Sequence, residues 1–147
     1  MKSKRNTLLT LLFLTIIIAC QTSKKATVTR VPVINIKIDE KYNMNMRVDF
    51  KIDSAVIVGD TITLKVSFNK STGADIFELI GNKMYLKSKP LKLQMFVSHI
   101  KSGEATEKKT TRTLRFNIAA IKPEFDAGEL MFITIPGFSD KIPYKLK

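Results

Sequence analysis

From Val31 onward, hydrophobic and polar residues alternate in short runs that are separated by turn residues. Ile62, Leu64, Val66 and Phe68 occupy every second position, with Thr, Lys and Ser residues between them. Successive side chains of a strand point to opposite faces, so such a run has one face for a core and one for water. The same alternation, or a short apolar run, predicts further strands at residues 34–38, 43–52, 76–80, 83–86, 91–98, 114–118, 130–135 and 141–146.

Turn residues separate these predicted strands. Gly59-Asp60 and Gly81-Asn82 each lie between two apolar runs, and glycine supplies the positive φ that two-residue hairpins require, so both pairs predict tight hairpins. Ser102-Gly103 predicts the start of a polar loop that continues through Lys109. Residues 119–128 predict a crossover that contains one helical turn.

Seven to nine short strands in about 115 residues are typical of an all-β fold. The run 130–135 is apolar on both faces, which indicates a central strand, and Pro143 indicates an edge strand because an edge can spare a hydrogen-bond donor. We therefore predict an antiparallel immunoglobulin-like β-sandwich over residues 31–147. A small β-barrel is the alternative.

The amino-terminal segment has a different pattern. Met1 to Asn6 contains three basic residues and no acidic one, and Thr7 to Ala19 is thirteen residues without a charge. A helix of that length rises only about 20 Å, against roughly 30 Å of hydrocarbon in a bilayer. The segment therefore favours a cleaved signal peptide over a membrane-spanning helix.

The end of this segment, Ile17-Ile18-Ala19-Cys20, resembles the lipobox of bacterial lipoprotein signal peptides. The resemblance implies that the Cys20 thiol accepts a diacylglyceryl group and that a signal peptidase cuts before Cys20, with Ile17, Ile18 and Ala19 as its recognition residues. Fatty acyl chains such as palmitate then hold the protein on a membrane. The alternative is a buried cysteine after an ordinary secretory peptide.

These features predict three segments: a signal-peptide helix at 1–19, a lipidated cysteine with a flexible tether at 20–30, and the β-domain at 31–147. The ends of a tether of this length lie about 17 Å apart on average. Gln21 follows the cysteine. In enterobacterial lipoproteins an Asp at that position retains the protein at the inner membrane, so the resemblance implies the outer membrane and leaves the periplasmic or surface leaflet open.

Charge and cysteine content add two constraints. The chain has 25 Lys and Arg residues against 13 Asp and Glu residues, and loss of residues 1–19 leaves a net charge of +9. Cys20 is the only cysteine, so the domain has no disulfide despite an envelope location where disulfides persist.

Basic residues are concentrated between residues 83 and 115, a stretch that contains nine Lys and Arg residues but only two acidic residues. If these side chains converged, they would attract anionic glycans, lipopolysaccharide phosphates or lipid headgroups. The alternative is a solvated face whose lysines protect sheet edges from aggregation. Nucleic acid is not an expected partner, since a protein of the cell envelope does not meet it. The basic stretch also lacks aromatic residues interleaved in the manner of a platform on which bases could stack. The candidate anion-binding residues are Lys83, Lys87, Lys89, Lys92, Arg112 and Arg115.

The chain contains none of the phosphate-binding, nucleophile-elbow or zinc-binding motifs that indicate catalysis. His99, the one histidine, is expected to be a strand-end residue entering a loop, with a metal site alongside Asp75, Glu104 or Glu107 as the less favoured alternative. No metal or cofactor is therefore expected. A carboxylate pair for glycoside hydrolysis is the remaining catalytic alternative, with Asp49, Asp53, Glu78 and Glu124 as candidates that are otherwise solvated.

Phe77-Glu78-Leu79, followed by Lys87-Ser88-Lys89-Pro90 and a strand that ends in His99, is similar to a block of uncharacterised small envelope proteins. The resemblance covers residues 72–118 at most. Such proteins often carry cysteines on either side of the block, and this chain has none there, so a thiol or disulfide role does not carry over. The expected function is a lipid-anchored outer-membrane lipoprotein with a non-catalytic binding or scaffolding domain. Its expected partners are the membrane, envelope proteins or anionic glycans.

Overall fold

The structure is a computed structural model that describes residues 30–41, 48–122 and 128–146. Contacts divide the chain into Met1–Arg30 and Val31–Lys147. The signal-peptide helix, Cys20 and the tether were predicted for residues 1–30, and 1–29 lie outside the described residues. Among the described residues, no helix is both long enough and apolar enough to cross a bilayer.

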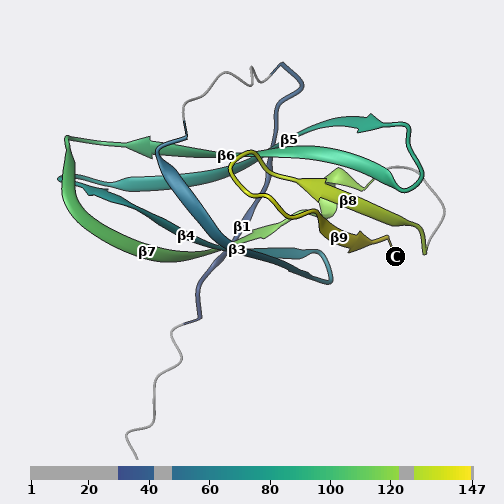
Figure 1. The fold of residues 1–147 in the computed structure, drawn as a ribbon, viewed down its shortest axis with the longest axis horizontal. Coiled ribbons are helices and arrows are strands. Elements are labelled where there is room, and N and C mark those ends of the chain that lie inside the picture. Colours follow the sequence, from purple (N-terminus) through teal and green to yellow (C-terminus); the bar gives the residue numbers. More distant parts are fainter. Residues whose placement is uncertain (1–29, 42–47, 123–127, 147) are drawn as a thin grey trace, which may run out of the picture. The chain divides into compact units, whose positions relative to one another are not determined.

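The described part of the second unit contains nine β-strands and one short 3-10 helix (Figure 1). They form two sheets, one with the order β1-β7-β4-β3 and the other with the order β2-β5-β6-β8-β9. The elements are β1 (Val33–Asn35), β2 (Lys37–Ile38), β3 (Phe50–Val58), β4 (Thr61–Ser71), β5 (Asp75–Leu86), β6 (Leu91–Lys101), β7 (Ala105–Asn117), η1 (Ala119–Ile121), β8 (Leu130–Thr134) and β9 (Ile142–Lys145).

This arrangement confirms the predicted all-β sandwich. The barrel alternative is wrong, because the described strands pair into two separate sheets and not into one closed sheet. The expectation of a wholly antiparallel fold is also wrong, since β1–β7, β2–β5 and β6–β8 are parallel pairs. Parallel neighbours need a crossover connection. Between β6 and β8 the chain makes that crossover by passing through β7 in the opposite sheet.

The alternating residues meet between the two sheets, as predicted. Ile62, Leu64 and Val66 of β4 are fully buried, and Leu93 and Met95 of β6 are fully buried opposite them in the same core cluster. Burial of such a side chain contributes roughly 1.5–3 kcal/mol. The core is therefore built from the residues that the period of two selects.

The first predicted strand is divided between the sheets. β1 pairs with β7 in one sheet, and β2, two residues further on, pairs with β5 in the other. Ile36 lies between them, is buried, and donates its N–H to the Asn117 carbonyl at 3.1 Å. Ile34 is 48% exposed, so the alternation over residues 34–38 places only Ile36 in the core.

The predicted hairpin at Gly81-Asn82 is wrong. β5 runs through both residues, with a register irregularity between Gly81 and Tyr85 and a positive φ of 55° at Lys83. A Cβ at Gly81 would lie 3.0 Å from side-chain atoms of both Ile36 and Ile121, so this glycine makes room for the crossing segments. The hairpin between β5 and β6 instead turns at residues 87–90.

Other turn predictions have mixed outcomes. Gly59-Asp60 forms the predicted β3–β4 hairpin, with a φ of 58° at Gly59, and Pro143 lies on the edge strand β9. The polar loop predicted for residues 102–109 is too long, because β7 already begins at Ala105. The strand predicted over residues 43–52 begins at Phe50 and continues to Val58, and residues 42–47 lie outside the described residues.

Candidate functional site

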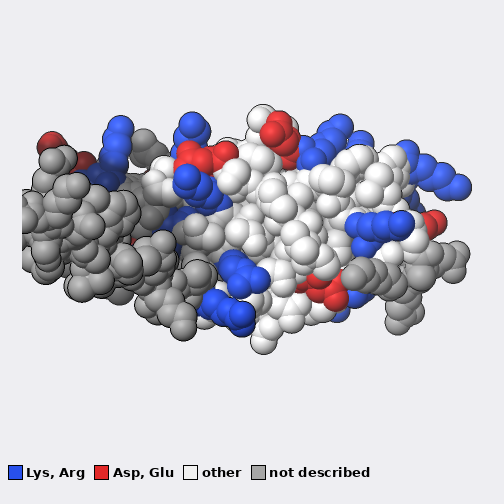
Figure 2. All heavy atoms as spheres, turned by 90° about the horizontal axis from the view of Figure 1, so that it is seen from below, with Lys and Arg blue, Asp and Glu red and all other residues white. Residues whose placement is uncertain are grey.

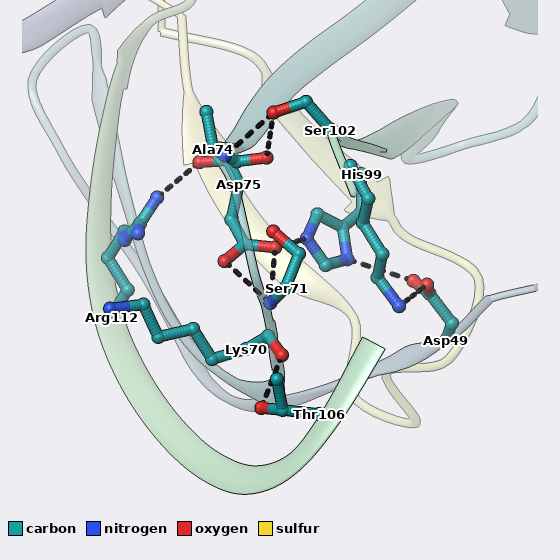
Figure 3. Close-up of polar contacts among 10 residues, drawn as sticks. Asp49, Lys70, Ser71, Ala74, Asp75, His99, Ser102, Thr106 and Arg112 are labelled. Carbon is teal, nitrogen blue, oxygen red and sulfur yellow. Dashed lines mark hydrogen bonds and ion pairs between the residues drawn. The ribbon is translucent and has the colours of Figure 1, made fainter. Parts of the chain in front are cut away.

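The most distinctive polar group in the described residues surrounds His99. It lies where the β4–β5 and β6–β7 connections cross from one sheet to the other. Figure 3 shows side chains from both sheets meeting around the imidazole ring. We call this group the His99 cluster and define it as Asp49, Ser71, Asp75, His99, Lys101 and Arg112.

The two crossing connections bind each other directly. The Thr72 N–H donates to the Glu104 carbonyl at 2.9 Å, and the Ser102 N–H donates to the Ala74 carbonyl at 2.9 Å. The Ser102 hydroxyl also accepts the Ala74 N–H at 2.7 Å. A Cβ at Gly73 would lie 2.0 Å from the Ser102 carbonyl oxygen, so only glycine fits at this contact. These bonds fix the end of the sandwich that carries the His99 cluster.

The His99 side chain is only 1% exposed. Its Nδ1 lies 2.9 Å from Asp49 Oδ1, and its Nε2 lies 3.1 Å from Asp75 Oδ1. The ring stacks on Phe77, with centroids 4.2 Å apart and an interplanar angle of 8°, and meets Phe68 edge-on at 5.0 Å. The imidazole is therefore held by two carboxylates within an aromatic enclosure.

Hydrogen bonding favours the ionised form of both carboxylates. Burial raises the pKa of Asp75, but hydrogen bonds from Ser71 and His99 outweigh it and leave the pKa below the ordinary value of 3.8. Burial likewise raises the pKa of Asp49, and Lys101 and His99 lower it further than burial raises it. An ionised carboxylate only accepts hydrogen bonds, so both contacts to His99 are hydrogen bonds when both ring nitrogens carry hydrogen.

Arg112 joins the two sheets at the same end. Its Nη1 donates to the main-chain carbonyl of Asp75 at 2.6 Å, from β7 in one sheet to β5 in the other. The guanidinium carbon also lies 5.4 Å from the centre of the Phe68 ring and 5.7 Å from that of Phe77. Such cation–π contacts contribute about 0.5–1 kcal/mol each at partly exposed sites. Arg112 therefore already has partners within the fold.

The His99 cluster is not arranged as a Ser-His-Asp triad. A triad histidine binds a carboxylate through one nitrogen and the nucleophile through the other, whereas both nitrogens of His99 face carboxylates. The Ser71 N–H donates to Asp75, and the buried Ser71 hydroxyl has no hydrogen-bond partner among the described residues. The expectation that His99 is a strand-end residue entering a loop is wrong, since β6 continues to Lys101 and the side chain is buried.

Among the described residues, the carboxylates near His99 are not placed to hold a metal ion with it. Asp75 binds the imidazole directly, and Glu104 and Glu107, the other two residues of the less favoured metal site, are exposed. Within the described residues, no group of three or more His, Cys, Asp or Glu side chains is placed to hold a metal ion.

The carboxylates considered for hydrolysis are dispersed. Asp49 belongs to the His99 cluster, Asp53 accepts a hydrogen bond from the Ser67 hydroxyl, and Glu78 lies 3.7 Å from Lys37 Nζ. Glu124 lies outside the described residues. These contacts place the three described carboxylates with separate partners.

The end of the sandwich opposite the His99 cluster carries a surface hollow. It has a volume of about 530 Å³ and is lined by residues 87–91 of the β5–β6 turn and by Glu129 and Leu130 before β8. Lys87 and Lys89 are exposed at this turn, Lys83 is exposed on β5, and Lys92 is half-buried on β6. The fold thus brings four of the six predicted anion-binding residues to one hairpin.

The other two predicted residues lie on β7 in the opposite sheet. Arg112 belongs to the His99 cluster, and Arg115 Nη1 donates to the Val31 carbonyl at 3.4 Å. Figure 2 shows Lys and Arg side chains scattered over one face of the molecule, with uncharged areas between them. The basic stretch 83–115 is therefore divided between two sheets.

Comparison with protein-family models and with curated protein sequences gives no match. Among solved structures, the crystal structure of a NigD-like immunity protein from Bacteroides caccae matches with a TM-score of 0.51 at 11% identity. The two share a fold. The match covers 77% of this chain and 59% of that one, so this chain spans little more than half the length of its structural neighbour.

Proposed function

We propose that this chain is a lipid-anchored protein of the outer membrane whose β-sandwich acts by binding or scaffolding and not by catalysis. The observation that carries the proposal is the lipobox-like Ile17-Ile18-Ala19-Cys20, which ends the uncharged run that begins at Thr7 and precedes a short polar stretch. A compact sandwich begins directly after that stretch, at Val31. A lipid at Cys20 would hold this domain within a short tether of the membrane.

Two observations support binding over catalysis. The one histidine is enclosed by aromatic rings and bound through both nitrogens, so it is not free to act as a general base. The solved structure that shares the fold is that of a NigD-like immunity protein, a name that denotes no catalytic activity. We propose for this chain a role that depends on contact with a partner.

The anchor is tested by intact mass spectrometry of the native protein and by labelling cells with an alkyne analogue of palmitate. We expect a mature chain that begins at Cys20, carries acyl chains and sediments with outer membranes. Cys20→Ser should abolish the label, while Ser23→Ala, three residues away, should leave it intact. An unmodified thiol at Cys20, or an intact Met1 in the soluble fraction, would contradict the proposal.

The binding role is tested by cross-linking in intact cells, followed by solubilisation of the envelope in detergent. We expect the protein to migrate in a defined complex, and a Cys20→Ser chain lacking the anchor to lose that complex. If the native protein migrates alone under all cross-linking conditions, the scaffolding role is wrong.

A further inference from the structure

The β5–β6 hairpin end combines exposed apolar side chains with lysines. Met84 and Leu86 of β5 are 64% and 65% exposed, and Leu130 of β8 is 42% exposed. Leu130 and the turn after Leu86 line the same surface hollow. Exposed lysines at this end include Lys83, Lys87 and Lys89, and Lys145 of β9 pairs with Leu130.

The backbone of β5 explains why these apolar side chains face outward. Tyr85, which lies between Met84 and Leu86, pairs with the buried Leu93 and donates its hydroxyl hydrogen to the Ile121 carbonyl at 2.5 Å. Tyr85 therefore belongs to the inner face, and its two neighbours face away from the core. Exposure of Met84 and Leu86 is a consequence of strand geometry and not of a frayed end.

Hydrogen bonds also define the turn that carries the lysines. The Ser88 N–H donates to the Leu86 carbonyl at 2.8 Å, and the Ser88 hydroxyl donates to the Pro90 carbonyl at 2.7 Å. Lys87 and Lys89 flank this fixed serine. Glu129 is the one acidic residue among those that line the hollow, so the two lysines outnumber it.

We propose that this end of the sandwich docks onto an anionic lipid bilayer. Met84, Leu86 and Leu130 enter the interfacial region, while Lys83, Lys87 and Lys89 bind headgroup phosphates. Apolar side chains ringed by lysines are the combination that binds proteins to the surface of anionic membranes. A soluble polyanion such as a glycan would use the lysines but would leave the three apolar side chains in water.

This inference rests on the proposed envelope location and adds a second membrane contact that does not need the lipid on Cys20. It predicts that the sandwich lies against the bilayer through its β5–β6 end.

The test uses the mature chain, residues 20–147, with Cys20→Ser so that no lipid is attached. We compare its sedimentation with anionic vesicles of phosphatidylglycerol and phosphatidylethanolamine and its sedimentation with vesicles of phosphatidylcholine alone, which carry no net charge. We expect binding to the anionic vesicles only. Each lysine near an anionic surface strengthens the partitioning of a protein from water to the membrane about fivefold. Lys87→Gln with Lys89→Gln should therefore weaken vesicle binding roughly 30-fold. Met84→Ser with Leu86→Ser should weaken it about tenfold even at raised salt.

Matched controls separate this site from diffuse charge. Lys108→Gln with Lys109→Gln removes the same charge from exposed positions on β7, and Val56→Ser with Val58→Ser removes exposed apolar side chains from β3. Neither control should change vesicle binding by more than about twofold. Equal losses in the hairpin and control variants would overturn the proposal, as would binding to heparin without binding to anionic vesicles.

The result is independent of the anchor experiment. Vesicle binding by the unlipidated chain would stand even if Cys20 proved unmodified in cells. If the native chain is lipidated but its Cys20→Ser form does not bind anionic vesicles, the proposed anchor is supported and the proposed docking surface is refuted.

Discussion

Asp75 and His99 face each other diagonally across β5 and β6, with 3.1 Å between Asp75 Oδ1 and His99 Nε2. In the strand register Asp75 is opposite Lys101 and His99 is opposite Phe77, so the bond joins residues of adjacent rungs. Both side chains are 1% exposed. The pair is thus a buried, charge-assisted contact at the point where the chain crosses between sheets.

Removal of the Asp75 carboxylate should destabilise the fold strongly. Asp75→Ala leaves the Ser71 N–H and His99 Nε2 buried without this acceptor, and each buried polar group left unsatisfied costs about 1–3 kcal/mol. Urea unfolding followed by circular dichroism measures the loss. Asp53→Ala is the matched control, since Asp53 binds Ser67 and Lys51 near the surface and should contribute under about 1 kcal/mol. Equal losses for the two variants would contradict a buried role for Asp75.

Stability should fall as the pH is lowered. Burial raises the pKa of Asp75 and of Asp49, but hydrogen bonds lower both pKa values below 3.8 on balance. The unfolded chain then binds protons before the folded one does, so the stabilisation is complete above about pH 5 and is lost as the pH falls through the folded pKa values. Urea unfolding at pH 6, 5, 4 and 3 measures this loss. Asp49→Asn with Asp75→Asn should flatten the pH dependence, and an unchanged slope would contradict the assignment.

The Ser71 hydroxyl should be dispensable for stability. It is buried without a hydrogen-bond partner among the described residues, whereas the Ser71 main-chain N–H binds Asp75. Ser71→Ala removes the hydroxyl and keeps the main-chain bond, so we expect the free energy of unfolding to change by no more than about 1 kcal/mol. Thermal unfolding by calorimetry measures the change. A loss of more than about 1 kcal/mol would show that the hydroxyl has a partner in solution.

The sequence allowed the core to be predicted more successfully than the His99 cluster. The alternation in β4 depends only on neighbours along the strand, and every predicted core position from Ile62 to Phe68 is buried. The same alternation from Leu93 through Val97 places His99 on the inner face, which is the signal that could have located it. Its partners Asp49 and Asp75 come from distant segments, so no local pattern links them.

Gly81 shows why one turn prediction failed. Gly-Asn between apolar runs is typical of a hairpin. In the fold, however, the Ile36 and Ile121 side chains pack against the Gly81 main chain, and a Cβ there would crowd both. The start of β7 was missed for a similar reason. Residues 105–111 are polar in composition, and the side chains of β7 are buried in the core only from Leu114 onward. In both cases the deciding contacts lie far away in the sequence.

Gly73 should not tolerate any side chain. Its Cβ would lie 2.0 Å from the Ser102 carbonyl oxygen, which is main chain and cannot rotate away, so Gly73→Ala should cost about 3 kcal/mol or more. Gly59→Ala is the control. Gly59 has a φ of 58° but no atom within 4 Å of a Cβ, so its substitution should cost only about 1–2 kcal/mol of backbone strain. The midpoints of urea unfolding compare the two, and a larger loss for Gly59→Ala would refute the tight contact between the connections.

The end of the fold opposite the His99 cluster contains a second, partly buried polar contact, which alkaline titration can test. The Tyr144 hydroxyl donates to Asp60 Oδ1 at 2.8 Å, and Lys122 Nζ lies 2.9 Å from Asp60 Oδ2. Burial, together with the charge on Asp60, raises the pKa of Tyr144 well above its ordinary value of 10. The folded state therefore holds this proton more tightly than the unfolded state. The resulting stabilisation is present below about pH 10 and is lost as the pH rises further.

Tyr144→Phe should therefore lower the free energy of unfolding by about 1.5–3 kcal/mol at pH 7, because Asp60 loses a hydrogen bond to its charge. Tyr85→Phe is the control, since the Tyr85 hydroxyl donates to a neutral carbonyl and should contribute about 1 kcal/mol. In a titration followed by tyrosinate absorbance, the last tyrosine to ionise should be missing from Tyr144→Phe. If the native protein ionises all three of its tyrosines near pH 10 while it remains folded, the Tyr144–Asp60 contact is not formed in solution.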